Sequence, residues 1–319
     1  MKKILVFIVS IFIGFSLVSC TNHEETYDVY VTVYPMKYVT ERLFEGTNYT
    51  VGIVPGVTSH ENSVDWSPKE IIAMTEATYL FYVGANYDQY IDYQINSIFT
   101  DKYVQLVKVE DQTDYIQYIE GIIDNHDEEL PNDSSLGTDP HFWVSPLKVI
   151  QVTNLIYDKL VLKFDDSNYK MRNNYNKLID DLETLSNTFQ NVISYSRKIA
   201  MTSTNLYGYL RNDYGFNYIS ISPGYHEETE QFTSQEKEEI VNHAIENKIK
   251  YIIYEKYTSS PLSNAVFDEL SNLNMEPIKL EFHILQSLTD EDIANGDDYI
   301  TVMYDNLELL KLALDYQEE

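Results

Sequence analysis

The chain has 319 residues and a formal net charge of −29, with 22 Lys and Arg against 51 Asp and Glu. This charge argues against nucleic-acid binding, where affinity comes largely from Lys and Arg that neutralise phosphates. The single Cys excludes a disulfide within the chain. A hydrophobic content of 44% argues against disorder, and the length predicts about two domains of roughly 150 residues. An acidic surface favours solubility, and it also suits the binding of a cationic ligand.

The N-terminal segment predicts where the protein resides. A short basic start is followed by the apolar run Ile4–Leu17. This run is shorter than the roughly 20 residues of a transmembrane helix but fits the core of a signal peptide. It ends in Leu17-Val18-Ser19-Cys20, which resembles a bacterial lipobox and implies cleavage before Cys20 and lipidation of its thiol. We therefore expect a signal peptide over 1–19, a tether over 20–26, and an extracytoplasmic protein anchored to the bacterial cell membrane by lipid.

Strands and helices alternate in the first half of the mature chain. The apolar and β-branched runs predict three strands, over 28–34, 50–54 and 79–83. The third is apolar throughout, which predicts a central position in a parallel sheet. Helices are expected over 36–44 and from Ser67, which can serve as an N-cap. This alternation predicts a doubly wound α/β lobe over 27–165.

The pattern changes after Pro146 and then returns to alternation. A helix over 147–162 is followed by a much longer one over 166–196. Its apolar residues recur every three or four positions and are Leu178, Leu182, Leu185, Phe189 and Val192. The later predicted elements are strands over 198–202, 217–221, 250–254 and 277–281 and a helix over 299–314. We therefore predict an α/β fold with two doubly wound lobes, the second over 197–319, joined by a single long connecting helix.

Four of the seven His follow predicted strands, where ligands bind in open α/β sheets. These are His60, His141, His226 and His283. Neutral imidazole is a common ligand for zinc and other divalent transition metals, and a closed site takes about four ligands. Because no pair has the i, i+4 spacing of a local helix site, these side chains would have to converge through folding. The other three, His23, His126 and His243, look peripheral, and the acidic loop around His126 reads as a solvated loop.

Several motifs resemble one known family across essentially the whole mature chain. The most specific is Asp139-Pro140-His141-Phe142-Trp143-Val144-Ser145-Pro146. Others are Val54-Pro55-Gly56 leading to His60 and Asp65–Pro68, and the C-terminal run from Asp298 to Leu307. The chain thus resembles the metal-binding receptors, or solute-binding lipoproteins, of zinc and manganese ABC importers. The resemblance implies a protein that is not an enzyme, captures a divalent metal ion between two lobes, and delivers it to an ABC permease and its ATPase.

The chain departs from that family at one ligand position. Where the family has a third ligand, His or Glu, this sequence has Thr204, whose hydroxyl is a poor ligand for a transition metal. We expect His226 to replace it, because its strand should neighbour the one ending at Thr202. The fourth ligand is expected at His283, with Glu255 as the carboxylate alternative. A site rich in imidazoles favours Zn²⁺, and Mn²⁺ remains the alternative because it prefers more oxygen donors.

Other functions remain open on the sequence. An extracytoplasmic zinc-dependent hydrolase would need three protein ligands, an open position and a general base such as Glu227, and no HExxH motif is present. An adhesin with a purely structural metal is a second alternative. A third alternative is a transport receptor for an organic or chelated ligand. Thr204 favours this alternative, because it occupies the position of the family's third metal ligand.

Overall fold

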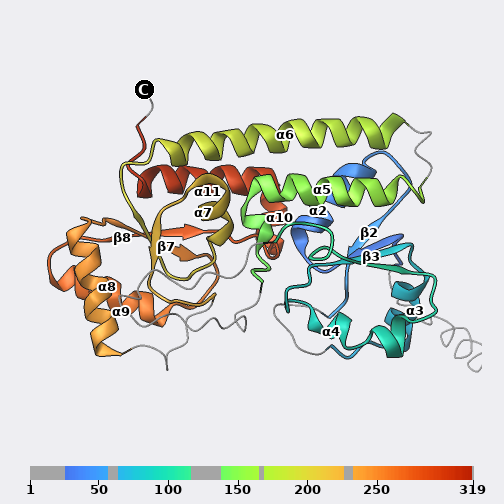
Figure 1. Ribbon diagram of the computed structural model, residues 1–319, viewed down its shortest axis with the longest axis horizontal. Helices are drawn as coiled ribbons and strands as arrows, with labels where there is room; N and C mark the ends of the chain where they lie inside the picture. The colour runs from blue at the N-terminus through green and yellow to red at the C-terminus, as the bar shows by residue number, and fades with distance from the viewer. Residues whose placement is uncertain (1–25, 57–63, 116–137, 165–168, 226–232, 318–319) are drawn as a thin grey trace, which may run out of the picture.

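The structure, a computed structural model, describes residues 26–56, 64–115, 138–164, 169–225 and 233–317. Within them lie two four-stranded parallel sheets, each at the centre of one lobe (Figure 1). The first lobe contains β1 (Val29–Val31), β2 (Val51–Ile53), β3 (Tyr79–Tyr82) and β4 (Gln105–Lys108). The second contains β5 (Ala200–Thr202), β6 (Tyr218–Ser220), β7 (Tyr251–Glu255) and β8 (Ile278–Phe282).

Both sheets have the same strand order. In each, later strands are added on both sides of the first strand, so both sheets are doubly wound. The order is β2-β1-β3-β4 in the first lobe and β6-β5-β7-β8 in the second, with every pair parallel. The predicted α/β fold class is therefore confirmed, as is the internal position of the apolar strand β3. Because all strands of a sheet run the same way, their carboxyl ends meet at one edge, where ligands bind in such folds.

Helices pack on both faces of each sheet, as successive strand residues alternate between two cores. In the first lobe, Val29 and Val31 face a core that includes α2 (Tyr34–Phe44) and α5 (Pro146–Leu160). Tyr30 faces α3 (Pro68–Glu76) and α4 (Gln89–Asp92). In the second lobe, Met201 faces α8 (Ser234–Glu246) and α9 (Pro261–Asn272). The first-lobe helices are α2 (Tyr34–Phe44), α3 (Pro68–Glu76), α4 (Gln89–Asp92), a π-helical turn η1 (Ile95–Phe99), a 3₁₀ turn η2 (Phe142–Val144) and α5 (Pro146–Leu160). The later helices are α6 (Tyr169–Ser194), α7 (Gly208–Tyr214), α8 (Ser234–Glu246), α9 (Pro261–Asn272), α10 (Asp290–Asn295) and α11 (Tyr299–Ala313).

The 26-residue helix α6 runs along both lobes (Figure 1). It packs against α2 and α5 of the first lobe and against α11 of the second. The apolar face predicted from the sequence, represented by Leu182, Leu185 and Phe189, is fully buried. These side chains belong to one apolar core that includes residues of both lobes. The helix therefore connects the lobes by burying a shared surface as well as by chain continuity.

A local sequence signal accounts for the start of α3. Ser67 caps α3 as predicted, accepting a hydrogen bond from the Glu70 amide, while the Glu70 carboxylate accepts one from the Ser67 amide. The strand β4 was not among the predicted strands.

Among the described residues, no helix is both long and apolar enough to cross a membrane.

Candidate metal centre

His141 lies just before η2 and is held by a carboxylate two residues earlier. Oδ1 of Asp139 accepts hydrogen bonds from the backbone amide of His141 and from its ring nitrogen Nδ1, both at 2.9 Å. In the tautomer with the hydrogen on Nδ1, the Asp139 carboxylate accepts that hydrogen and the lone pair of the ring lies on Nε2. Both side chains are buried. Metal-binding histidines are typically oriented in this way, with one ring nitrogen donating to a carboxylate and the other facing the metal.

Aromatic rings from both lobes surround the imidazole of His141. Tyr87 and Trp143 of the first lobe lie with ring centroids 6.3 and 5.4 Å away, and both meet the imidazole edge to face. Tyr225 of the second lobe lies closer, at 4.5 Å. Tyr225 directly precedes His226, so the chain of the second lobe passes His141 next to one of the predicted ligands. The predictions based on sequence missed these rings, because their approach depends on contacts between distant segments.

The segment holding His141 is hydrogen-bonded to the second lobe on several sides. The Tyr209 hydroxyl donates to the carbonyl oxygen of Asp139 at 2.8 Å. The indole nitrogen of Trp143 donates to the carbonyl of Ile284 at 2.9 Å, and the Tyr299 hydroxyl donates to the carbonyl of Trp143 at 2.8 Å. His141 therefore lies at the boundary between the lobes, in a segment of the first lobe that is held by hydrogen bonds from the second.

Thr204 and Glu255 meet at the carboxyl edge of the second sheet. The Thr204 hydroxyl donates a hydrogen bond to Oε1 of Glu255, and both side chains are buried. The next residue, Asn205, donates its backbone amide to the carbonyl of Gly224 at 2.9 Å. Gly224 precedes Tyr225, the residue in contact with His141, so the loops after β5 and β6 lie side by side. The predicted adjacency of those two strands is confirmed by their parallel pairing.

His283 follows β8 and has hydrogen-bond partners at both ring nitrogens. Its Nδ1 accepts from the Leu285 amide at 3.0 Å, and its Nε2 lies 3.3 Å from Oδ2 of Asp292. Burial lowers the pKa of His283, and the adjacent Asp292 carboxylate acts in the opposite direction. Coordination of a metal by this imidazole would require one of the two hydrogen bonds to break. Its predicted role as a ligand stays a prediction.

The remaining predicted site residues lie outside the described residues. These are His60, His226 and the lipidation residue Cys20. Among the residues that the structure does describe, no group of three or more His, Cys, Asp or Glu side chains is arranged to hold a metal ion. His141, Glu255 and His283 therefore do not form a complete site by themselves, and the predicted ligand set depends on His60 and His226.

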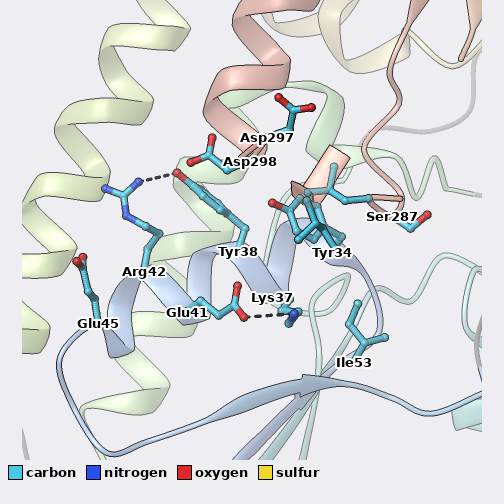
Figure 2. A pocket seen from close by; sticks show the side chains of 12 residues that line it. Tyr34, Lys37, Tyr38, Glu41, Arg42, Glu45, Ile53, Ser287, Asp297 and Asp298 are labelled. Carbon is cyan, nitrogen blue, oxygen red and sulfur yellow. Dashed lines mark hydrogen bonds and ion pairs between the residues drawn. The ribbon is translucent and has the colours of Figure 1, made fainter. Parts of the chain in front are cut away.

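A groove of about 530 Å³ marks the boundary of the two lobes beside α2 (Figure 2). Tyr34 and Tyr38 of α2 line one side, and Asp298 at the start of α11 lies on the other. Burial raises the pKa of both tyrosines, and the charge of Asp298 adds to the effect. None of the described candidate ligands lines this groove. We therefore place the candidate metal centre at His141 and not here.

A second buried carboxylate, Asp88, joins the ends of two first-lobe strands. It accepts hydrogen bonds from the Thr32 hydroxyl at 2.7 Å and from the amides of Val83 and Gly84 at 2.7 and 2.8 Å. Burial raises the pKa of Asp88 to about 6, although these hydrogen bonds act to lower it. Asp88 follows the strand β3, but an isolated Asp in a predicted loop gives no sequence signal of burial.

Replacing Asp88 by Asn should alter how stability depends on pH. The pKa in the folded chain, about 6, lies above the ordinary value of 3.8, so the folded state binds the proton more tightly. This contribution is complete below about pH 4 and is lost as the pH rises through 6. The stability advantage of the wild type over Asp88→Asn should therefore fall by up to about 3 kcal/mol across that window. Urea unfolding at pH 4, 5, 6 and 7 measures it, and a pH-independent difference would contradict the assignment.

Comparison with known proteins adds three observations. A family model described as zinc-uptake complex component A, periplasmic, matches residues 29–313. The zinc-binding lipoprotein AdcA of Streptococcus pneumoniae R6 is 26% identical over 333 aligned residues, which cover 99% of this chain and 62% of that protein. The high-affinity zinc uptake system protein ZnuA of Bacillus subtilis is 24% identical, covering 93% of this chain and 90% of that protein. The chain thus spans less than two thirds of the length of AdcA.

Solved structures show the same fold. The Zn(II)-bound ZnuA-like domain of S. pneumoniae AdcA matches with a TM-score of 0.68 at 24% identity, covering 92% of this chain and all of that one. The metal-dependent lipoprotein YcdH of B. subtilis matches with a TM-score of 0.71 at 21% identity, covering 90% of this chain and 98% of that one. At these identities the likeness concerns the fold.

Proposed function

Because this chain belongs to the family of zinc-uptake complex component A, we propose that it captures one zinc ion between its two lobes and delivers it to the permease of an ABC importer. The observation that carries this proposal is the buried His141–Asp139 pair at the boundary of the lobes, which presents Nε2 as a ligand atom. Zn²⁺ accepts imidazole nitrogen readily, whereas Mn²⁺ prefers oxygen. The metal is the cargo of the protein, and its role is binding and delivery and not catalysis.

The ligands come from both lobes in this proposal. His60 and His141 bind from the first lobe. His226 binds from the second, supported by the contact of the preceding residue, Tyr225, with His141. For the remaining position, His283 is the expected ligand and Glu255 is the carboxylate alternative; both side chains are buried and hydrogen-bonded.

The site works from outside the cytoplasm. Lipidation of Cys20 would tether the chain to the membrane surface, and AdcA of S. pneumoniae is named a lipoprotein. The shared core along α6 and the hydrogen bonds of Tyr209, Trp143 and Tyr299 oppose large rotation of one lobe against the other. Metal entry and release therefore depend mainly on movements of loops around the site.

Titration of the metal-free mature chain with zinc and then with manganese tests this function. We expect tight binding of one zinc ion per chain by calorimetry, with manganese weaker. If neither metal binds tightly, the proposal is wrong. Turnover of ester, peptide or phosphate substrates by the zinc-loaded chain would favour the hydrolase alternative instead.

Asp139 should contribute to zinc affinity without touching the metal. Replacing it by Ala removes the acceptor that fixes the orientation of the His141 ring. Loss of such a partner typically costs 10- to 100-fold in affinity, and we expect a weakening on the order of that range for Asp139→Ala. Asp139→Asn keeps an acceptor oxygen and should lose less. Competition with a zinc chelator measures both variants, and equal affinities for the wild type and Asp139→Ala would refute the role.

A further inference from the structure

The groove beside α2 runs along that helix and has walls from both lobes (Figure 2). Its α2 wall extends from Tyr34 to Glu45, about 16 Å of helix at a rise of about 1.5 Å per residue. The backbone amide of Tyr34 donates to the carbonyl of Gln286 at 3.4 Å, which joins the two lobes at one end of this wall. The second lobe contributes Ser287, Leu288, Ile293, Asp297 and Asp298. A segment bound in the groove therefore contacts both lobes at once.

The two cationic side chains of the groove are paired within the chain. Nζ of Lys37 lies 3.3 Å from Oε1 of Glu41. Nη2 of Arg42 lies 2.7 Å from Oδ2 of Asp181, and its Nη1 donates to the Tyr38 hydroxyl at 2.6 Å. Neither cation is therefore free to neutralise the carboxylates on the opposite wall.

Those carboxylates, Asp297 and Asp298, precede α11. Within the part of the chain that the structure describes, neither of them forms an ion pair. The Asp298 side chain caps α11 by accepting a hydrogen bond from the Thr301 amide at 2.9 Å, and a helix N-terminus stabilises negative charge. The charge of Asp298 acts across the groove, since it adds to burial in raising the pKa of both Tyr34 and Tyr38. The groove thus carries excess negative charge beside two tyrosine rings.

This combination suits a guanidinium or ammonium group. A cation within about 6 Å of an aromatic ring is attracted to its face. Arg42 shows this interaction inside the groove, with its guanidinium carbon 5.6 Å from the centroid of the Tyr38 ring. No cation from the described residues lies over the neighbouring ring of Tyr34. Ile293, which also lines the groove, is 61% exposed and offers apolar surface to the aliphatic part of a Lys or Arg side chain.

We propose that this groove is a docking site for an extended basic segment of a partner polypeptide, whose Arg or Lys side chain lies between the Tyr34 ring and the carboxylates of Asp297 and Asp298. The length of the groove favours a peptide over a single small cation, because about 16 Å corresponds to about five residues of extended chain. Its volume of about 530 Å³ lies within the range of about 300–1,000 Å³ that is usual for ligand sites. The inference goes beyond the proposed function, since none of the described candidate metal ligands lines the groove.

Titration of the ¹⁵N-labelled mature chain with the acetylated pentapeptide Ala-Arg-Ala-Arg-Ala, followed by NMR at physiological salt, tests the inference. We expect saturable shifts at the amides of groove residues such as Tyr34 and Ile293, and none with Ala-Gln-Ala-Gln-Ala. Asp297→Asn/Asp298→Asn removes two charges and keeps a good capping side chain on α11, so it should weaken peptide binding by about fivefold to tenfold.

The matched control is Asp268→Asn/Asp305→Asn, which changes the net charge equally at exposed positions on α9 and α11 outside the groove. It should alter the affinity by less than about twofold, because salt screens distant charges. Thermal unfolding checks that each variant folds, and Asp297→Asn, which leaves the cap of α11 intact, carries the test if the double variant does not. Equal weakening by the control, or no saturable shifts in the groove, overturns the inference. Spermidine that binds the groove as tightly as the peptide overturns the assignment of a polypeptide.

Discussion

Replacing His141 by Ala is expected to weaken zinc binding by more than about 100-fold, because a direct ligand should cost more than the 10- to 100-fold typical of the residues behind it. The imidazole is buried and held by Asp139, so the substitution removes a ligand that is already oriented. The combined variant His60→Ala/His141→Ala should bind no zinc at micromolar concentrations. Competition titration against a chelator of known affinity measures both effects.

The control for this experiment is His243→Ala. His243 lies on α8, and the sequence marks it as peripheral to the site. This variant should bind zinc as the wild type does. Wild-type affinity in the folded His141→Ala variant would place the metal elsewhere in the molecule.

Replacing Phe189 by Ala should destabilise the whole chain by about 3–5 kcal/mol, the usual cost of removing a fully buried aromatic side chain. Phe189 lies on α6, is fully buried, and meets the Tyr214 ring with centroids 6.0 Å apart. Because the core around α6 includes residues of both lobes, the loss should appear in a single unfolding transition.

Urea unfolding followed by circular dichroism and tryptophan fluorescence tests this prediction. Asn187→Ala, an exposed substitution on the same helix, is the control and should change stability by less than about 0.5 kcal/mol. Two separate transitions in the wild type would contradict a core shared by the lobes.

Most of the fold was predictable from the sequence, because its signals are local. The alternation of β-branched runs with helical segments predicted both parallel sheets, and the spacing of apolar residues predicted α6. The strand β4 was missed because its buried residue Val107 stands between the partly exposed Leu106 and Lys108, a weak pattern in a short run. Its place in the sheet comes from pairing with β3.

The candidate site was predictable only in part. The motif around His141 is contiguous, so the sequence could single it out. The contact between His141 and Tyr225 and the bond between Thr204 and Glu255 join segments far apart in the chain. They depend on strand register and loop packing, which no local pattern encodes. The two partners at the ring nitrogens of His283 likewise become visible only once Leu285 and Asp292 are placed.

The central claim is that zinc binds at His141, between the lobes. Anomalous diffraction at the zinc absorption edge, from crystals of the mature chain grown with one equivalent of zinc, tests it most directly. We predict one strong peak about 2.0–2.1 Å from Nε2 of His141, the usual length of a zinc–nitrogen bond, with ligands from both lobes around it. A peak away from His141, or none in crystals of a zinc-loaded chain, would contradict the claim.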